Sequence, residues 1–110
     1  MEIDQETSKR IQELQLLEQS YQNILIQKQT FQVEANESKT ALEEINKSKG
    51  DVFRVLGQVM IKADPKQLKK ELKEKKDILD MKLKAVDKQE LGLREQIERL
   101  RSDVMSKINQ

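Results

Sequence analysis

The chain has 110 residues and a net charge of +1; 37% of its residues are charged and only 3% are aromatic. Average domains carry about 25% charged residues, so this composition favours long helices or a coiled coil with a narrow apolar seam over a broad core. The lack of Cys and His excludes disulfides, thiol catalysis and Cys-based zinc sites, and removes the commonest general base. No apolar run is long enough to span a membrane, and the start MEIDQETSKR lacks the order of a signal peptide. We therefore expect a soluble, cytoplasmic protein.

The first half of the chain predicts one helix of a coiled coil, over about residues 3–48. Its apolar residues alternate steps of three and four for more than four heptads, with Lys28 and Ser38 as polar interruptions. The predicted seam comprises Leu14, Leu17, Tyr21, Ile24, Lys28, Phe31, Ala35, Ser38, Leu42 and Ile45, and continues weakly back to Arg10, Thr7 and Ile3. Gly50, which can take a left-handed cap, and the lysines before it predict where the helix ends.

The segment VFRVLGQVMIK, residues 52–62, predicts a β-hairpin that turns near Gly57, because β-branched and aromatic residues flank this glycine. Alternation places apolar side chains on both faces of the hairpin. A lone two-stranded hairpin is marginal in water and its edges are open, so we expect other chains to cover it. The candidate oligomerisation residues are Val52, Phe53, Val55, Leu56, Val59, Met60 and Ile61.

A second helix is predicted over residues 65–109. Asp64 is the expected N-cap, Pro65 occupies the first helical position, and Gln67 follows the cap by three residues. The predicted seam of this helix comprises Leu72, Lys76, Leu79, Leu83, Val86, Glu90, Leu93, Ile97, Leu100, Val104 and Lys107.

Two helices of similar length joined by a short connector are expected to pair antiparallel. Residues 1–48 carry five basic and nine acidic side chains, and residues 65–110 carry thirteen and nine, so the halves have opposite net charge. With Gly57 as the point of symmetry, facing residue numbers sum to about 114 in an a-against-d register. The facing pairs are then Leu42–Leu72, Ala35–Leu79, Phe31–Leu83, Tyr21–Leu93, Leu17–Ile97 and Leu14–Leu100.

The charged groups of the helices point to no catalytic site. Lys28 and Glu90 lie one layer apart, where they either pair across the seam or extend separately to water. Acid–base catalysis needs carboxylates with perturbed pKa values in an enclosed cleft, which two paired helices do not provide, so we expect no enzyme activity. The basic run at residues 66–76 contains Glu71 and Glu74 and lacks interleaved aromatic residues, which favours a solvated face over a nucleic-acid patch.

Together these segments resemble the beta-class subunits of archaeal and eukaryotic prefoldin. The resemblance is carried by VFRVLGQVMIK with its Phe53-Arg54 pair and Leu56-Gly57 turn, by ALEEI at residues 41–45, and by KELKEKKDILDMKLKAVDKQE at residues 70–90. Alpha-class subunits are longer and insert two hairpins, whereas this chain has one. The similarity covers essentially the whole chain as a single prefoldin-like domain, residues 1–110.

The resemblance implies a mainly α fold, in which two long antiparallel helices are joined by a hairpin, and hairpins assemble into a β-barrel platform in a hexamer. The implied partners are two alpha-class and four beta-class subunits in all, unfolded client proteins and a group II chaperonin, without nucleic acid or membrane. The implied function is that of an ATP-independent chaperone, or holdase. No cofactor is expected, since the three glycines form no phosphate-binding loop.

Clients are expected at the tips of the coiled coil, where the two termini lie. Residues Ile11, Met105 and Ile108 fall off the seam, and Val104 faces a stretch of the first helix that offers only Thr7 and Arg10. The candidate client-binding residues are Ile3, Ile11, Leu14, Leu100, Val104, Met105 and Ile108. The alternative functions are a structural coiled-coil tether or scaffold and an RNA-binding helical arm; neither needs a β segment that is apolar on both faces.

Overall fold

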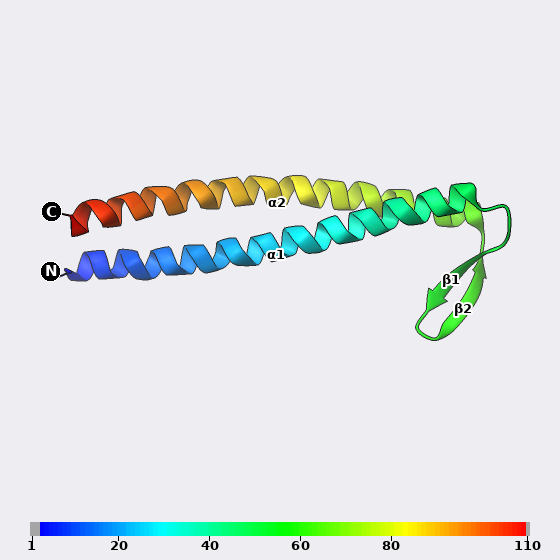
Figure 1. The fold of residues 1–110 in the computed structure, drawn as a ribbon, viewed down its shortest axis with the longest axis horizontal. Coiled ribbons are helices and arrows are strands. Elements are labelled where there is room, and N and C mark those ends of the chain that lie inside the picture. Colours follow the sequence, from blue (N-terminus) through cyan, green and yellow to red (C-terminus); the bar gives the residue numbers. More distant parts are fainter. Residues whose placement is uncertain (1–2, 110) are drawn as a thin grey trace. The chain divides into compact units, whose positions relative to one another are not determined.

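The computed structural model describes residues 3–109 as helix, strand, strand and helix. Helix α1 spans Gln5–Lys47, β1 Val52–Leu56, β2 Val59–Ala63 and α2 Pro65–Ile108 (Figure 1). The chain divides into two compact units: a terminal unit of residues 1–29 with 84–110, and a hairpin unit of residues 30–83. In each unit a segment of α1 pairs with a segment of α2. The predicted fold class, two long helices joined by one antiparallel hairpin, is confirmed.

The start of α1 is capped by Asp4. Its Oδ1 accepts a hydrogen bond of 2.7 Å from the backbone N–H of Thr7, and its carbonyl accepts one of 3.0 Å from the N–H of Ser8. Hydrogen bonds from the side chain and backbone of Thr7 hold the pKa of Asp4 below its usual value, because they favour the ionised carboxylate. The helix therefore begins after this cap, and Ile3, the first predicted seam residue, lies outside it.

The N-cap predicted at Asp64 for the second helix is confirmed. Its Oδ1 accepts a hydrogen bond from the N–H of Lys66 at 3.2 Å, and its carbonyl accepts one from the N–H of Leu68 at 3.0 Å. The prediction that Gln67 completes the cap is not followed, because its side-chain amide donates to Glu71, one turn further along α2, at 3.4 Å.

The hairpin turns at Gly57, and Gly50 does not adopt the left-handed conformation predicted for it. Among residues 3–109, Gly57 alone has a positive φ, of 61°. The left-handed cap predicted at Gly50 is therefore wrong; α1 ends at Lys47 without it. Leu56 pairs with Val59, so Gly57 is the first residue of a two-residue turn, where a positive φ fits a type II′ turn.

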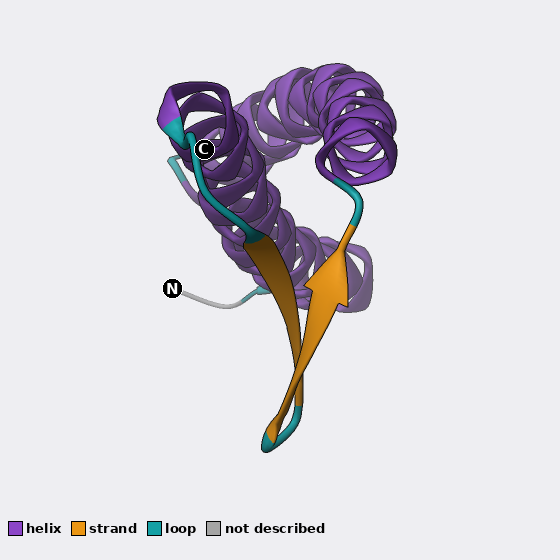
Figure 2. Ribbon diagram, turned by 90° about the vertical axis from the view of Figure 1, so that its right-hand side faces the viewer, coloured by secondary structure: helices purple, strands orange, loops and turns teal. Residues whose placement is uncertain are grey.

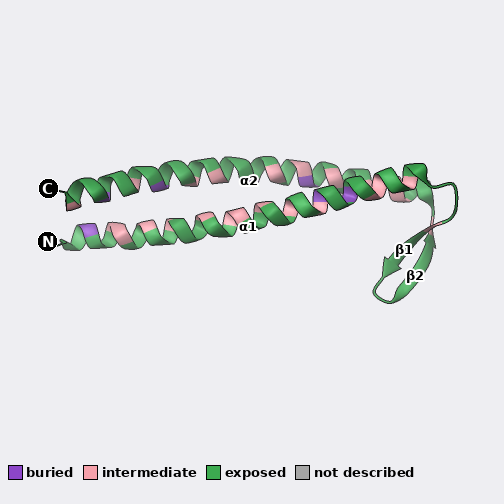
Figure 3. Ribbon diagram, viewed as in Figure 1, coloured by how far each residue is buried: buried purple, intermediate pink, exposed green. Residues whose placement is uncertain are grey.

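The predicted seam is the stripe along which the two helices meet. Every predicted seam residue from Thr7 to Ile45 in α1 and from Leu72 to Val104 in α2 is buried or half-buried (Figure 3). Lys107, the last predicted seam residue, is exposed instead. The most buried side chains are Ala35, Ser38 and Leu79 in the hairpin unit and Thr7, Val86, Ile97 and Val104 in the terminal unit.

Contacts across the seam agree with the predicted register. In the terminal unit, the Arg94 guanidinium donates to the Tyr21 hydroxyl at 3.3 Å, and Arg94 adjoins the residue predicted to face Tyr21. In the hairpin unit, the Lys82 ammonium lies 5.5 Å from the centre of the Phe31 ring, and Lys82 adjoins the residue predicted to face Phe31. A register shifted by a heptad would separate both pairs by about 10 Å along the helices, since each residue rises about 1.5 Å.

Candidate assembly and client-binding surfaces

The hairpin presents two apolar faces. Its two strands, β1 and β2, form one antiparallel hairpin (Figure 2). Phe53 is opposite Lys62, and Val55 is opposite Met60. Side chains that are directly opposite share a face, and neighbours along a strand alternate between faces. The first face therefore carries Phe53, Val55, Met60 and Lys62, and the second carries Val52, Arg54, Leu56, Val59, Ile61 and Ala63.

Both faces are open in the single chain. The exposed fraction is 47% for Phe53, the least exposed large side chain of the first face, and 48% for Ile61 on the second. Of the seven predicted oligomerisation residues only Val52 is half-buried, and the rest are exposed. Large contiguous apolar patches are rare on monomeric proteins and mark interaction sites. The chain alone leaves this patch uncovered.

One ion pair ties the hairpin to the start of α2. The Arg54 guanidinium donates to the Glu71 carboxylate, and Gln67 donates to the same side chain at 3.4 Å. Arg54, followed by Gln67, holds the pKa of Glu71 below its usual value. Beside this contact, the second hairpin face and the first turns of α2 enclose a groove of about 320 Å³ that includes Leu56, Ile61 and Leu68. This ion pair could not be predicted from the sequence, because its partners lie 17 residues apart in different elements.

A group of polar side chains crosses the seam of the terminal unit. We call Tyr21, Lys28, Asp87, Glu90 and Arg94 the polar clasp. The Lys28 ammonium lies 2.8 Å from Asp87 Oδ1 and 2.9 Å from Glu90 Oε2. The Tyr21 hydroxyl donates to Glu90 at 3.4 Å, and Arg94 donates to Glu90 at 3.0 Å. Of the two alternatives for Lys28 and Glu90, the structure adopts pairing across the seam.

The polar clasp is centred on Glu90, whose side chain is 12% exposed. The hydrogen bond from Lys28 is the main cause that holds the pKa of Glu90 below its usual value. Hydrogen bonds to Asp87 and then Glu90 raise the pKa of Lys28. The spacing of Asp87, Glu90 and Arg94 by three and four residues puts them on one face of α2, which is the signal that could have revealed the whole cluster.

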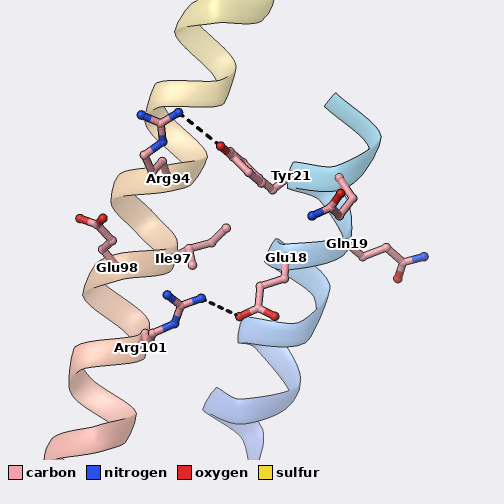
Figure 4. Close-up of a pocket in the computed structure, with 8 residues that line it drawn as sticks. Glu18, Gln19, Tyr21, Arg94, Ile97, Glu98 and Arg101 are labelled. Carbon is pink, nitrogen blue, oxygen red and sulfur yellow. Dashed lines mark hydrogen bonds and ion pairs between the residues drawn. The ribbon is translucent and has the colours of Figure 1, made fainter. Parts of the chain in front are cut away.

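A groove of about 470 Å³ runs beside the seam of the terminal unit (Figure 4). It is bounded by two contacts between the helices: Arg94 with Tyr21, and Arg101 with Glu18 at 3.2 Å. Between them the Ile97 side chain reaches toward α1 (Figure 4). The remaining lining is polar, so the groove is the outer margin of the seam rather than an enclosed cleft.

The predicted client-binding residues differ in how accessible they are. Ile3 and Met105 are exposed, whereas Leu14, Leu100, Ile11 and Ile108 are half-buried. Val104, expected to lack a good apolar partner and so to be left exposed, is instead buried, with only 5% of its surface exposed. Thr7, a seam residue of α1 in the same unit, is also buried, at 4% exposed.

No group of three or more Asp, Glu, His or Cys side chains that could hold a metal ion is found within residues 3–109. Neither helix, over its described length, is apolar enough to cross a bilayer.

Comparison with known proteins identifies the family. The family model described as "Prefoldin subunit" matches residues 8–110. Prefoldin subunit beta of Methanothrix thermoacetophila is 31% identical over 111 residues, covering 99% of this chain and 92% of the relative. Prefoldin subunit beta of Pyrococcus furiosus is 33% identical over 96 residues, covering 86% and 82%. The crystal structure of the prefoldin beta subunit from Thermococcus strain KS-1 matches with a TM-score of 0.84 at 30% identity, covering 96% of this chain and 94% of that one.

The helix–hairpin–helix fold and these relatives define a molecular chaperone subunit. The chain belongs to the prefoldin family, since the family match covers nearly all of it. As a prefoldin subunit, it assembles with other prefoldin subunits. The resemblance drawn from the hairpin and its flanking helices is thereby confirmed.

Proposed function

We propose that the chain is a beta-class subunit of a hexamer with two alpha-class and four beta-class members, and that it holds non-native proteins without using nucleotide. Its clients bind toward the ends of the helices that carry the termini, and they pass to a group II chaperonin. The chain acts in the cytoplasm and is not an enzyme. This is the function that the fold and the family relationship support best.

The observation that carries the assembly part of this proposal is the hairpin, which is open on both faces. Burying apolar surface contributes roughly 25 cal/mol per Å², so six exposed large apolar side chains offer a strong driving force for association. Two open strand edges also supply unpaired backbone groups that can extend a sheet into neighbouring hairpins. A platform made of several hairpins satisfies both needs at once.

The client-binding part rests on the apolar residues of the terminal unit. Single contacts with an apolar client segment are weak, but several subunits on one platform present several such sites. Linked sites convert weak individual affinities into useful avidity. Binding of this kind requires neither a catalytic group nor a nucleotide-binding loop.

Aggregation of a chemically unfolded protein, followed by light scattering, tests this function. The complex of this chain with an alpha-class subunit is expected to suppress aggregation equally with and without ATP. A chain shortened by residues 1–14 and 100–110, which lacks all seven predicted client-binding residues, should form the same complex but protect poorly. Equal protection by the shortened complex would place the client site elsewhere.

A further inference from the structure

The apolar residues of the seam do not by themselves define one register for the two helices of the terminal unit. They recur with a heptad period on both α1 and α2, so sliding one helix past the other by a heptad brings apolar residues onto apolar residues again. In the observed register Tyr21 lies at the level of Leu93. A slide in one direction would place Tyr21 opposite Leu100, and a slide in the other would place it opposite Val86. Burial of apolar surface is non-directional, so it distinguishes these registers only weakly.

Two charged residues at seam positions are joined across the terminal unit. The Lys28 ammonium lies 2.9 Å from Glu90 Oε2 and 2.8 Å from Asp87 Oδ1. The exposed fraction is 28% for the Lys28 side chain and 12% for that of Glu90, so little water reaches the pair. Tyr21 and Arg94 donate hydrogen bonds to Glu90 Oε1 at 3.4 Å and 3.0 Å, so both oxygens of this carboxylate have partners. A charge held in this way is stable only while its partners are in place.

A slide by one heptad breaks this arrangement in either direction, because it moves Lys28 about 10 Å away from Glu90 along the helices. In one direction the ammonium would come beside Arg94, which has the same charge. In the other direction it would meet Asp80, but Glu90 would then lie opposite Leu17 without a cation from α1. Removing the partner of a partly buried charge is strongly destabilising. The charged pair therefore separates the registers in free energy where apolar burial does not.

Glu18 and Arg101 also pair across the terminal unit, at 3.2 Å, but this contact depends less on the register. The two side chains are 47% and 57% exposed, so water solvates both groups when the pair separates. Exposed ion pairs contribute little to stability. Of these contacts, those of the polar clasp are the ones that a shifted register would destabilise most.

We infer that the polar clasp sets the register of the two helices, with Lys28 and Glu90 as positioning residues that exclude heptad-shifted pairings of the seam. A polar position in an apolar seam specifies register at a cost in stability. In the observed register Gln5, the first residue of α1, and Ile108, the last of α2, fall at about the same level. A shifted register would leave about one heptad of one helix unpaired at this end. The inference holds whether or not the complex protects clients.

Distances between spin labels in the assembled complex test this inference. The chain has no cysteine, so Gln12→Cys with Leu91→Cys attaches one label to an exposed position of each helix. The labelled chain is diluted with unlabelled chain before assembly with an alpha-class subunit, so that each distance joins the two helices of one chain. The parent sequence should give one distance. Lys28→Leu with Glu90→Leu should add a second distance of comparable population, since a heptad shifts one label by about 10 Å along the helix.

A conservative substitution and a smaller apolar pair serve as controls. Lys28→Arg keeps the positive charge and should retain the single distance of the parent. If the leucines over-fill the seam, Lys28→Ala with Glu90→Ala asks the same question without added volume. A single, parent-like distance in the folded apolar variant would overturn the inference, because the hairpin and its connectors would then hold the register.

Urea unfolding separates register selection from simple stabilisation. Lys28→Leu alone leaves Glu90 without its cation and should lower the midpoint of unfolding. Lys28→Leu with Glu90→Leu should unfold at the midpoint of the parent or above it, because an apolar pair replaces a partly buried ion pair at little or no cost. A double variant that is less stable than the parent and keeps one distance would mean that the polar clasp only stabilises the seam, and would overturn the inference.

Discussion

The helices and the hairpin of this chain differ in how far their apolar residues are exposed. In the helices, the residues spaced by three and four, from Thr7 to Ile45 and from Leu72 to Val104, lie along a seam between α1 and α2, where they are buried or half-buried. In the hairpin, both faces are apolar and six of the seven predicted residues remain exposed. Apolar residues that pack against another segment of the same chain stabilise the fold. Apolar residues that no segment of the chain covers indicate a binding partner.

The largest effect is expected from charging the hairpin. Val55→Asp with Ile61→Asp places a carboxylate on each face, and burying an unpaired charge in an assembly is strongly unfavourable. The complex should dissociate into small species while helical circular dichroism is retained. The matched control is Ile78→Asp with Met81→Asp, two exposed apolar residues on α2, which should assemble normally. An intact complex in the hairpin variant, measured by light scattering, would refute the role of these faces.

Truncating one seam residue should distinguish buried from exposed positions within a single helix. Leu79 is 3% exposed, so Leu79→Ala should lower the free energy of unfolding by about 2–5 kcal/mol. Met81 is 70% exposed, and Met81→Ala should change it by less than about 0.5 kcal/mol. Urea unfolding at a fixed protein concentration measures both. Equal losses for the two variants would contradict the seam described here.

Replacing Gly57 and Gly92 with alanine should change the stability of the fold in opposite directions. At Gly57, with φ of 61°, an alanine is strained, and Gly57→Ala should cost about 1–2 kcal/mol. Gly92 lies within α2 with open space around it, so Gly92→Ala should stabilise by about 1 kcal/mol. Thermal unfolding of both variants beside the parent chain gives the comparison. A neutral Gly57→Ala would mean that the turn relaxes to another type.

A smaller effect is expected on acidification. Because Lys28 holds the pKa of Glu90 below its ordinary value of 4.5, the carboxylate stabilises the fold above that pH. This contribution is lost as the pH falls through the lower folded value. The stability difference between the parent and Glu90→Gln should therefore be constant near neutral pH and shrink in acid. A difference that grows on acidification would reverse the assigned sign.

Much of the fold could be predicted from periodicity alone. The steps of three and four identified the seam from Thr7 to Ile45, and the cap at Asp64 followed from its place before Pro65. These features are local, so the sequence around each residue is enough to specify them. The glycine prediction failed at Gly50 because a helix can also end without a left-handed residue, as α1 does after Lys47.

The surfaces were harder to predict because they depend on residues far apart in the chain. The seam pattern alone indicated that Val104 lacked a good apolar partner and stayed exposed, whereas Val104 is 5% exposed and Thr7, in the same unit, is also buried. Of the five residues of the polar clasp, only Lys28 and Glu90 were considered as a possible pair from the sequence. The other members could not be predicted, because contacts between α1 and α2 in this cluster join residues more than 60 positions apart in the sequence.

The central claim is that the hairpin requires other chains. The most direct measurement is the molar mass in solution, by light scattering, of this chain mixed with an alpha-class prefoldin subunit. We expect one species several times heavier than the 12.9 kDa of a single chain, stable on dilution. A mixture that remains at the masses of its separate chains would contradict it.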